Sequence, residues 1–316
     1  MKTILVLILT ILLATSAFSA KYAGESFSLG VGGRSLAMGG ATIAGPFDAT
    51  TGYWNPAGLN YLNGQNITAM HAETFGSLLN HDFIGYTSNR NKENSTIKAY
   101  GFYFYYLGGG GINITGWDAA RNRPVIIREV THGDYLFAGS VSGKIKDKFD
   151  FGVTARIIYR DLGISKGYGF TVDAGALYQV HPKIRLGLMI TDLTSGYIRF
   201  SQKYSESILP TVKPGVLYKH NIKDFTVRVA LSGDIKFEGI KYASQFWVGD
   251  ISLDTHFGGE ISYKELIFGR LGSDIGNFTA GVGLNINRII VDLAYLHNSD
   301  LDATFRVSAE IGRAHV

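Results

Sequence analysis

Apolar and polar residues alternate over most of the chain that follows residue 66, and this pattern restricts the possible folds more than any other feature. Between residues 225 and 237 the odd positions read F, V, V, L, G, I and F, whereas the even positions read T, R, A, S, D and K. The same alternation recurs in the ranges 151–160, 168–179, 278–287 and 304–310. A period of two is typical of a β-strand with one apolar and one polar face. The sequence therefore predicts an all-β protein.

Both a membrane barrel and a soluble β-sandwich produce such alternation. The runs here often exceed the ~5–6 residues usual for soluble strands, and aromatic residues lie toward their ends, as in the aromatic girdles of membrane barrels. The mean hydropathy is slightly positive, although no apolar stretch after residue 20 is long enough for a membrane helix. We therefore expect an all-β transmembrane antiparallel barrel whose apolar faces point outward.

The alternating runs give about fourteen strands, an even number within the range known for outer membrane barrels. Long links are expected at 108–133, 195–211 and 237–250. Because short turns usually face the periplasm, these long loops are expected to face the outside. The expected strands are 66–75, 81–89, 95–107, 134–144, 149–162, 165–179, 183–194, 212–220, 225–236, 253–263, 265–274, 277–287, 288–298 and 303–310.

The stretch from Leu29 to Leu59 differs from the rest, because glycines and prolines interrupt it too often for a long helix or strand. Its apolar side chains must still be buried away from water. Since a barrel with a lumen can enclose a compact segment, we expect residues 21–65 to form an N-terminal hatch, or plug, inside a barrel of residues 66–310. The residues of the expected hatch motif are Gly39, Gly40, Asn55, Pro56, Ala57 and Gly58.

Two motifs in this stretch resemble those of a known family. The sequence G-x-x-x-x-A-M-G-G-A at residues 32–41, followed by Y-W-N-P-A-G-L at 53–59, resembles the N-terminal signature of the PorV/PorQ family. That family looks like a branch of the FadL-type long-chain fatty acid transporters, whose hatch carries a similar Asn-Pro-Ala motif. The resemblance implies a passive channel for hydrophobic, fatty-acid-like small molecules. Because some members serve protein secretion, it also implies an alternative, a type IX secretion component that binds secreted cargo or translocon subunits.

The two ends of the chain bear on its location. Residues 1–20 combine Lys2, an apolar core from Ile4 to Leu13 and a zone of small residues, as a Sec-type signal peptide does; an uncleaved anchor helix is the alternative. Export and a barrel together predict the outer membrane of a diderm bacterium, in contact with its lipid. At the other end no aromatic residue closes the last strand, and we interpret residues 311–316, IGRAHV, as a possible non-native tail.

The third expected strand carries aromatic residues on both faces, so its lumen side is expected to be apolar, and four glycines at 108–111 follow it. In FadL-type channels a break in the corresponding strand opens the wall toward the bilayer beside the hatch. The resemblance therefore implies a path for a hydrophobic ligand there; alternatively, the aromatic residues pack against the plug and the glycines form a flexible external loop. The residues assigned to this path are Tyr100, Phe102, Phe104, Gly109 and Gly110.

Charged residues on the polar faces are expected to line the lumen. One interpretation is that arginines there bind an anionic head group such as a carboxylate. The other is that the charged residues pair with one another and hold the plug. The candidates are Arg156, Arg160, Asp173, Arg228 and Asp234, together with Arg185, Asp292, Arg306 and Glu310.

Other classes of function find little support. The net charge of +4 is small and scattered, so no nucleic-acid partner is expected. The eight histidines lie apart without metal-ligand spacing, and the chain has no cysteine, so no metal or other cofactor is expected. Neither a nucleophile elbow nor a phosphate-binding loop occurs. The sequence does not favour an enzyme.

Overall fold

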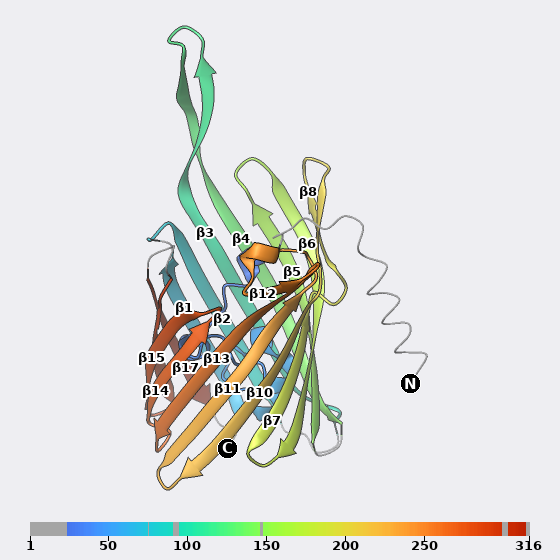
Figure 1. Cartoon of the computed structure of the whole chain (residues 1–316), viewed down its shortest axis with the longest axis vertical. Coiled ribbons are helices and arrows are strands. Elements are labelled where there is room, and N and C mark those ends of the chain that lie inside the picture. Colours follow the sequence, from blue (N-terminus) through green and yellow to red (C-terminus); the bar gives the residue numbers. More distant parts are fainter. Residues whose placement is uncertain (1–23, 75, 91–94, 146–147, 299–302, 314–316) are drawn as a thin grey trace, which may run out of the picture.

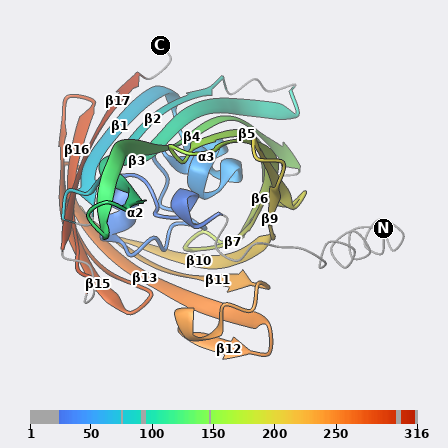
Figure 2. The ribbon, with the colours of Figure 1, turned by 90° about the horizontal axis from the view of Figure 1, so that it is seen from above.

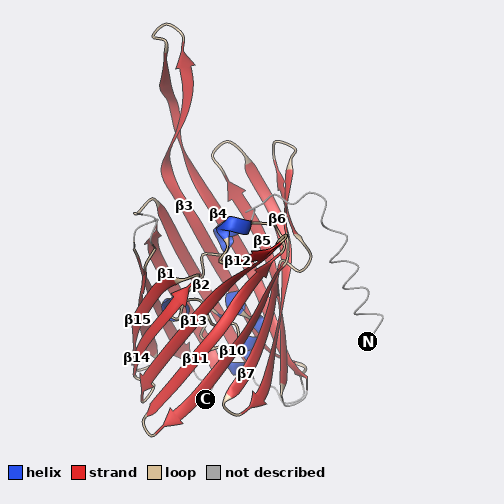
Figure 3. Ribbon diagram, in the orientation of Figure 1, coloured by secondary structure: helices blue, strands red, loops and turns tan. Residues whose placement is uncertain are grey.

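The computed structural model describes residues 24–74, 76–90, 95–145, 148–298 and 303–313, and fourteen antiparallel strands form a closed ring (Figures 1 and 3). The expected all-β barrel and its strand number are confirmed. The strands of the ring are β1 (Gly64–Thr74), β2 (Leu79–Asn89), β3 (Ile97–Asp118), β4 (Arg123–Ile145), β5 (Phe149–Asp161), β6 (Lys166–His181), β7 (Ile184–Thr191), β10 (Thr211–Ile222), β11 (Phe225–Lys236), β13 (Ile251–Tyr263), β14 (Ile267–Asp274), β15 (Asn277–Ile286), β16 (Ile289–Leu296) and β17 (Thr304–Arg313).

The ring closes where the last strand pairs with the first. β17 lies antiparallel to β1 in a continuous register from Gln65↔Arg313 to Ala72↔Arg306. Ile311, Gly312 and Arg313 take part in this pairing, so half of the suspected non-native tail extends the closing ladder, and β1 begins two residues before the expected barrel boundary. The origin of the tail stays a prediction. The expected signal peptide, residues 1–20, lies outside the described residues, as do residues 314–316.

Three short strands lie outside the ring, where the sequence predicts only loops. β8 (Gly196–Phe200) pairs with the upper part of β6, and β9 (Ser205–Ile208) pairs with β8. β12 (Phe246–Val248) pairs with β13 and follows a short helix, η3 (Lys241–Ala243). These strands have three to five residues, too few to show an alternating pattern.

The loop expected at 108–133 is instead a long hairpin that β3 and β4 continue beyond the ring (Figure 1). The β3–β4 ladder is irregular within the glycine run: it pairs as far as Gly109↔His132 and resumes at Ile112↔Val130. The register shifts between Gly109 and Ile112, where Gly111 has a φ of 77°, and this places a β-bulge at the base of the hairpin. The β2–β3 ladder runs without a shift from Asn80↔Gly108 to Asn89↔Ala99, so the described wall has no break there.

The outer surface of the ring is apolar and its inner surface is mixed. Phe278, for example, is 51 % exposed, whereas the adjacent Thr279 is 1 % exposed. Large apolar side chains point outward from nearly every strand, as a barrel in a bilayer requires. Within the described residues no helix has the length and apolar character needed to cross a membrane.

The N-terminal segment, residues 24–63, lies inside the ring of strands (Figure 2). It contains only short helical turns, because its glycines and prolines stop each of them. Most of its residues are buried. Its elements are η1 (Glu25–Phe27), α2 (Gly33–Ala37), α3 (Thr51–Trp54) and η2 (Pro56–Tyr61).

Candidate functional site

Glycines on the inner wall let the backbone of the N-terminal segment approach the strands closely. A Cβ at Gly187 would lie 2.6 Å from the carbonyl oxygen of Ile43, and one at Gly272 would lie 2.6 Å from the amide nitrogen of Gly39. No larger residue fits these places without a shift of backbone. The wall glycines at which an added Cβ would meet the segment are Gly85, Gly101, Gly152, Gly175, Gly187, Gly215, Gly258, Gly272 and Gly281, which we call the seat glycines. At Gly101, Gly175 and Gly281 the segment atoms met are side-chain atoms; at the others they include backbone atoms.

The expected hatch motif folds the segment and holds it against this wall. Asn55 is fully buried; its side-chain nitrogen donates to the carbonyl oxygen of Ile43 at 2.8 Å, and its side-chain oxygen accepts from the amide of Ala57 at 3.1 Å. Gly39 and Gly40 adopt φ values of 62° and 75°, which favour glycine. The remaining motif residues, Pro56 and Gly58, are buried in η2.

Part of the lumen wall is apolar. Inward-facing Phe83 of β2 and Tyr103 and Tyr105 of β3 pack around Tyr53 of the segment; the Tyr53 and Tyr105 rings are stacked with centroids 6.4 Å apart. The Tyr53 hydroxyl donates to the carbonyl oxygen of Phe27 at 2.7 Å. The apolar wall continues through Leu107, Leu136, Ile158, Ile198 and Phe200.

The expectation that Tyr100, Phe102 and Phe104 face the lumen is wrong. Phe102 is 58 % exposed on the outside of the ring, and Phe104 packs against Phe137, which is also on the outside. A shift of one residue exchanges the two faces of a strand. Because both faces of this strand are aromatic, polarity alone could not decide which one points inward.

The expected path residues Gly109 and Gly110 lie at the base of the external hairpin. A Cβ at Gly110 would have 3.6 Å to its nearest neighbour, whereas one at Gly109 would collide with the carbonyl oxygen of Leu78 in the β1–β2 turn. The five expected path residues therefore do not come together on the lumen wall.

The lumen wall also carries charged side chains, several of them on the same strands as the apolar residues, and most of these charges are paired. Arg156 donates to Asp173 at 2.6 Å and to Asp192 at 2.8 Å. Arg160 contacts Asp134 at 2.8 Å. Of the five arginines expected in the lumen, Arg156, Arg160 and Arg228 point inward and form such ion pairs. Among the described residues Arg185 and Arg306 form no ion pair; Arg306 donates instead to the carbonyl oxygen of Gly30 at 3.2 Å.

Arg228 and Asp234 belong to similar groups, as does Asp292, which contacts Arg270 at 2.5 Å. Arg228 contacts Glu260 and Glu265, each at 2.7 Å, and Asp234 accepts from Lys213 at 2.6 Å. Charge-assisted hydrogen bonds of this length are the strong kind. The geometry favours the second sequence interpretation for these side chains, since they pair with one another.

Several charged residues of the wall contact the N-terminal segment. Arg34 of α2 donates to both oxygens of Glu260, at 2.9 and 2.7 Å. Lys236 contacts Glu25 at 2.8 Å, and the amide of Ala49 donates to Glu310 at 2.9 Å. The segment is therefore held by ion pairs at its start and by close backbone packing farther along.

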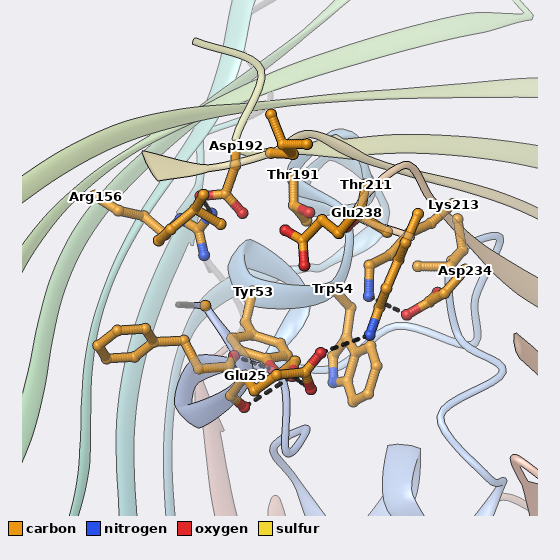
Figure 4. Close-up of a pocket in the computed structure, with 17 residues that line it drawn as sticks. Glu25, Tyr53, Trp54, Arg156, Thr191, Asp192, Thr211, Lys213, Asp234 and Glu238 are labelled. Atoms are coloured by element: carbon orange, nitrogen blue, oxygen red, sulfur yellow. Dashed lines mark hydrogen bonds and ion pairs between the residues drawn. The ribbon is translucent and has the colours of Figure 1, made fainter. Parts of the chain in front are cut away.

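A small pocket lies between apolar and charged residues near the end of the ring with the long loops (Figure 4). Its volume of about 70 Å³ suits several water molecules and is well below the ~300–1,000 Å³ of typical ligand pockets. Tyr53 and Trp54 line it together with the ion pairs Glu25–Lys236 and Lys213–Asp234. We call it the upper pocket.

Sequence reasoning missed several partners in these groups. Asp134, Asp192, Lys213 and Glu260 were not among the candidates, although Lys213 and Glu260 occupy polar positions in alternating strands. Arg34 lies inside the N-terminal motif, where no alternating pattern shows which way a side chain points. Glu260 could have been found from the alternation, because it lies on the polar face of its strand. In the structure it is directly opposite Arg228 in the register.

Comparison with known proteins shows which solved structures share the fold of this barrel. No family model matches the sequence, and no curated protein matches it either. Among solved structures, the CymD monoaromatic hydrocarbon channel superposes with a TM-score of 0.58 at 12% identity, covering 91% of this chain and 98% of that one.

Two further solved structures are similar. The Pseudomonas putida toluene transporter TodX has a TM-score of 0.53 at 11% identity, with 89% of this chain and 97% of that chain covered. A Pseudomonas aeruginosa FadL homologue has a TM-score of 0.51 at 12% identity, with coverage of 88% and 96%. At such identities the likeness concerns the fold, and the chain has the barrel fold of the FadL-type channels.

Proposed function

We propose that this protein is an outer membrane channel that passes hydrophobic small molecules without an energy source. The observation that carries the proposal is the apolar inner wall around Tyr53, Phe83, Tyr103 and Tyr105, inside a barrel with the fold of hydrocarbon channels. An open porin has a polar, water-filled bore. Here the bore holds the N-terminal segment, and part of the lumen wall is apolar.

The route follows from this distribution of apolar residues. A hydrophobic molecule entering from the loop side meets the upper pocket first and then the apolar part of the wall, where Phe27 and Tyr53 pack against β2 and β3. The charged residues offer no such path, because their ion pairs would have to be desolvated and broken. Since the upper pocket is small, passage requires the rings of Phe27 and Tyr53 to move aside.

The proposal is tested by uptake in bacteria that lack their own FadL-type channels. Cells expressing the full chain take up labelled toluene and oleate faster than cells with an empty vector, at equal surface abundance of folded protein. Leu107→Asp places a charge on the apolar inner wall and lowers this uptake severalfold. Phe104→Asn, a polar change on the outer face of the same strand, is the matched control for the lumen effect. Uptake equal to that of the empty vector would contradict the proposal.

The location in the outer membrane of a diderm bacterium, with lipid around the barrel, belongs to the same proposal. It is supported by the apolar outer face of the ring. The alternative role in type IX secretion, with cargo or translocon subunits as partners, stays a prediction from the PorV/PorQ resemblance. Of the solved structures named above, CymD is a monoaromatic hydrocarbon channel and TodX a toluene transporter.

A further inference from the structure

A second, larger pocket opens at the end of the ring that carries the short turns. Its volume is about 260 Å³, and it lies between the N-terminal segment and strands β6, β7, β10 and β11. Pro182 and Lys183 of the β6–β7 turn border it, as does Glu265 of the β13–β14 turn. Because short turns face the periplasm in such barrels, this lower pocket is at the periplasmic mouth.

Cations outnumber anions around the lower pocket. Lys219 of β10 is directly opposite Arg228 of β11 in the register, and its amide donates to the carbonyl oxygen of Lys183 at 2.8 Å. Like charges directly opposite one another across a ladder are destabilising. Arg185 lies two residues beyond Lys183, on the same inner face. The pocket therefore has a row of four basic side chains.

The carboxylates near the pocket are already occupied. Glu260 contacts Arg34, Arg228 and Arg270, and Glu265 contacts Arg228. Asp150, behind the segment, accepts from Asn60 and from the Tyr61 hydroxyl. 

Three cations remain without a carboxylate partner. Among the described residues no ion pair within 4.0 Å involves Lys183, Arg185 or Lys219. The guanidinium of Arg185 instead donates to the side chain of Gln179 at 3.0 Å. A row of cations that converges on a concave site without matching anions favours an anionic ligand there.

An aromatic surface completes the pocket. The Arg185 guanidinium lies 3.8 Å from the centroid of the Tyr61 ring and 5.4 Å from that of Phe47, and the two rings are 5.6 Å apart. Pro46 and Leu217 add further apolar surface beside them. The apolar part of a ligand could pack against these side chains while its charged group contacts the row of basic side chains.

We propose that the lower pocket binds a small organic carboxylate, with the carboxylate among Lys183, Arg185 and Lys219 and the apolar body on Phe47 and Tyr61. The volume suits a ligand with one ring or a short chain rather than a long fatty acid. The proposal does not rest on passage through the barrel, because binding in detergent and uptake by cells are separate measurements that fail independently.

The test titrates the full detergent-solubilised chain with 4-fluorobenzoate and follows the fluorine resonance. We expect saturable binding of 4-fluorobenzoate, at least tenfold weaker binding of the neutral 4-fluorobenzamide, and weakening as salt is added. The double variant Lys183→Gln/Lys219→Gln lowers the affinity for 4-fluorobenzoate roughly tenfold, about 1.4 kcal/mol for two charges. Arg185→Gln lowers it at least as much.

The controls separate recognition from folding. Lys264→Gln removes an exposed lysine at the same end of the ring, one that contacts Asp224 outside the lower pocket, and leaves the affinity unchanged. The double lysine variant keeps the contacts that Arg185 makes with the segment, so it remains informative if Arg185→Gln fails to fold. Equal affinity for the amide, or unchanged affinity in the double variant, would overturn the proposal. Displacement by inorganic phosphate at the same concentration would overturn the role of the aromatic surface.

Discussion

At the scale of single residues, the face of the strand on which a glycine lies determines how its replacement by alanine changes the stability of the barrel. Gly272 and Gly269 both belong to β14, three residues apart. A Cβ at Gly272 points inward to the Met38–Gly39 backbone, whereas one at Gly269 points outward and has its nearest neighbour at 3.7 Å. The same substitution should therefore have opposite consequences at the two positions.

We predict that Gly272→Ala destabilises the barrel by roughly 1–3 kcal/mol, because backbone atoms of the segment must shift to make room. Gly269→Ala is neutral or stabilising by up to ~1 kcal/mol, since alanine restricts the unfolded chain more than glycine does. Urea titration of both variants in lipid vesicles, followed by the loss of the fast-migrating folded band on gels, measures the two effects. Equal stability of the two variants would show that the N-terminal segment is not closely packed against the wall at Gly272.

The buried cluster around Glu260 gives a second prediction. Glu260→Gln leaves Arg34, Arg228 and Arg270 with one anion fewer in a buried place, and breaking a buried pair costs ~3–5 kcal/mol. Urea unfolding in vesicles should show a loss of this size. Glu265→Gln, whose side chain is 48% exposed, serves as the control and should cost under about 1 kcal/mol. A loss of the same size in both variants would contradict the role of Glu260 as the shared anion.

Residues differ in how well the sequence predicts their place. Arg156 and Arg228 lie in strands with one clearly polar face, so their inward direction follows from parity. Tyr100 and Phe102 lie in a strand whose two faces are equally aromatic, and the inner face is instead that of Tyr103 and Tyr105. The seat glycines gave no signal at all, because a glycine in an alternating strand fits either face.

At the scale of elements, the β3–β4 hairpin is independent of the ring. Beyond Gly109↔His132 its strands pair only with each other, and Trp117 and Ile127 are 65% and 67% exposed. We predict that deletion of residues 112–129, with Asn-Gly joining the ends, leaves the barrel folded and its urea midpoint within about 0.5 M of the full chain.

The check for this deletion is the folded band on unheated gels. A barrel that no longer forms this band would show that the hairpin takes part in folding of the ring. The sequence places strands well where they are long and alternate, and all fourteen expected strands have counterparts in the ring. The sequence could not predict the extension of β3 and β4, because a run of glycines such as 108–111 is typical of a loop. The bulge that accommodates these glycines depends on tertiary structure.

At the scale of the whole molecule, the ring and its contents depend on each other. Nine seat glycines and the ion pairs of Arg34 and Glu25 hold the N-terminal segment in the bore, and the segment covers apolar side chains that would otherwise face the lumen. The sequence indicated the barrel through alternation. It could indicate an enclosed segment only through composition and resemblance, because no periodic pattern connects residues 24–63 with the strands that receive them.

We propose that the N-terminal segment occludes the bore to ions while hydrophobic molecules pass. Ion conductance of the purified full chain in a planar lipid bilayer tests this. We expect no steady ohmic current above that of the bare bilayer. A steady current like that of an open porin, from protein verified as folded, would contradict it.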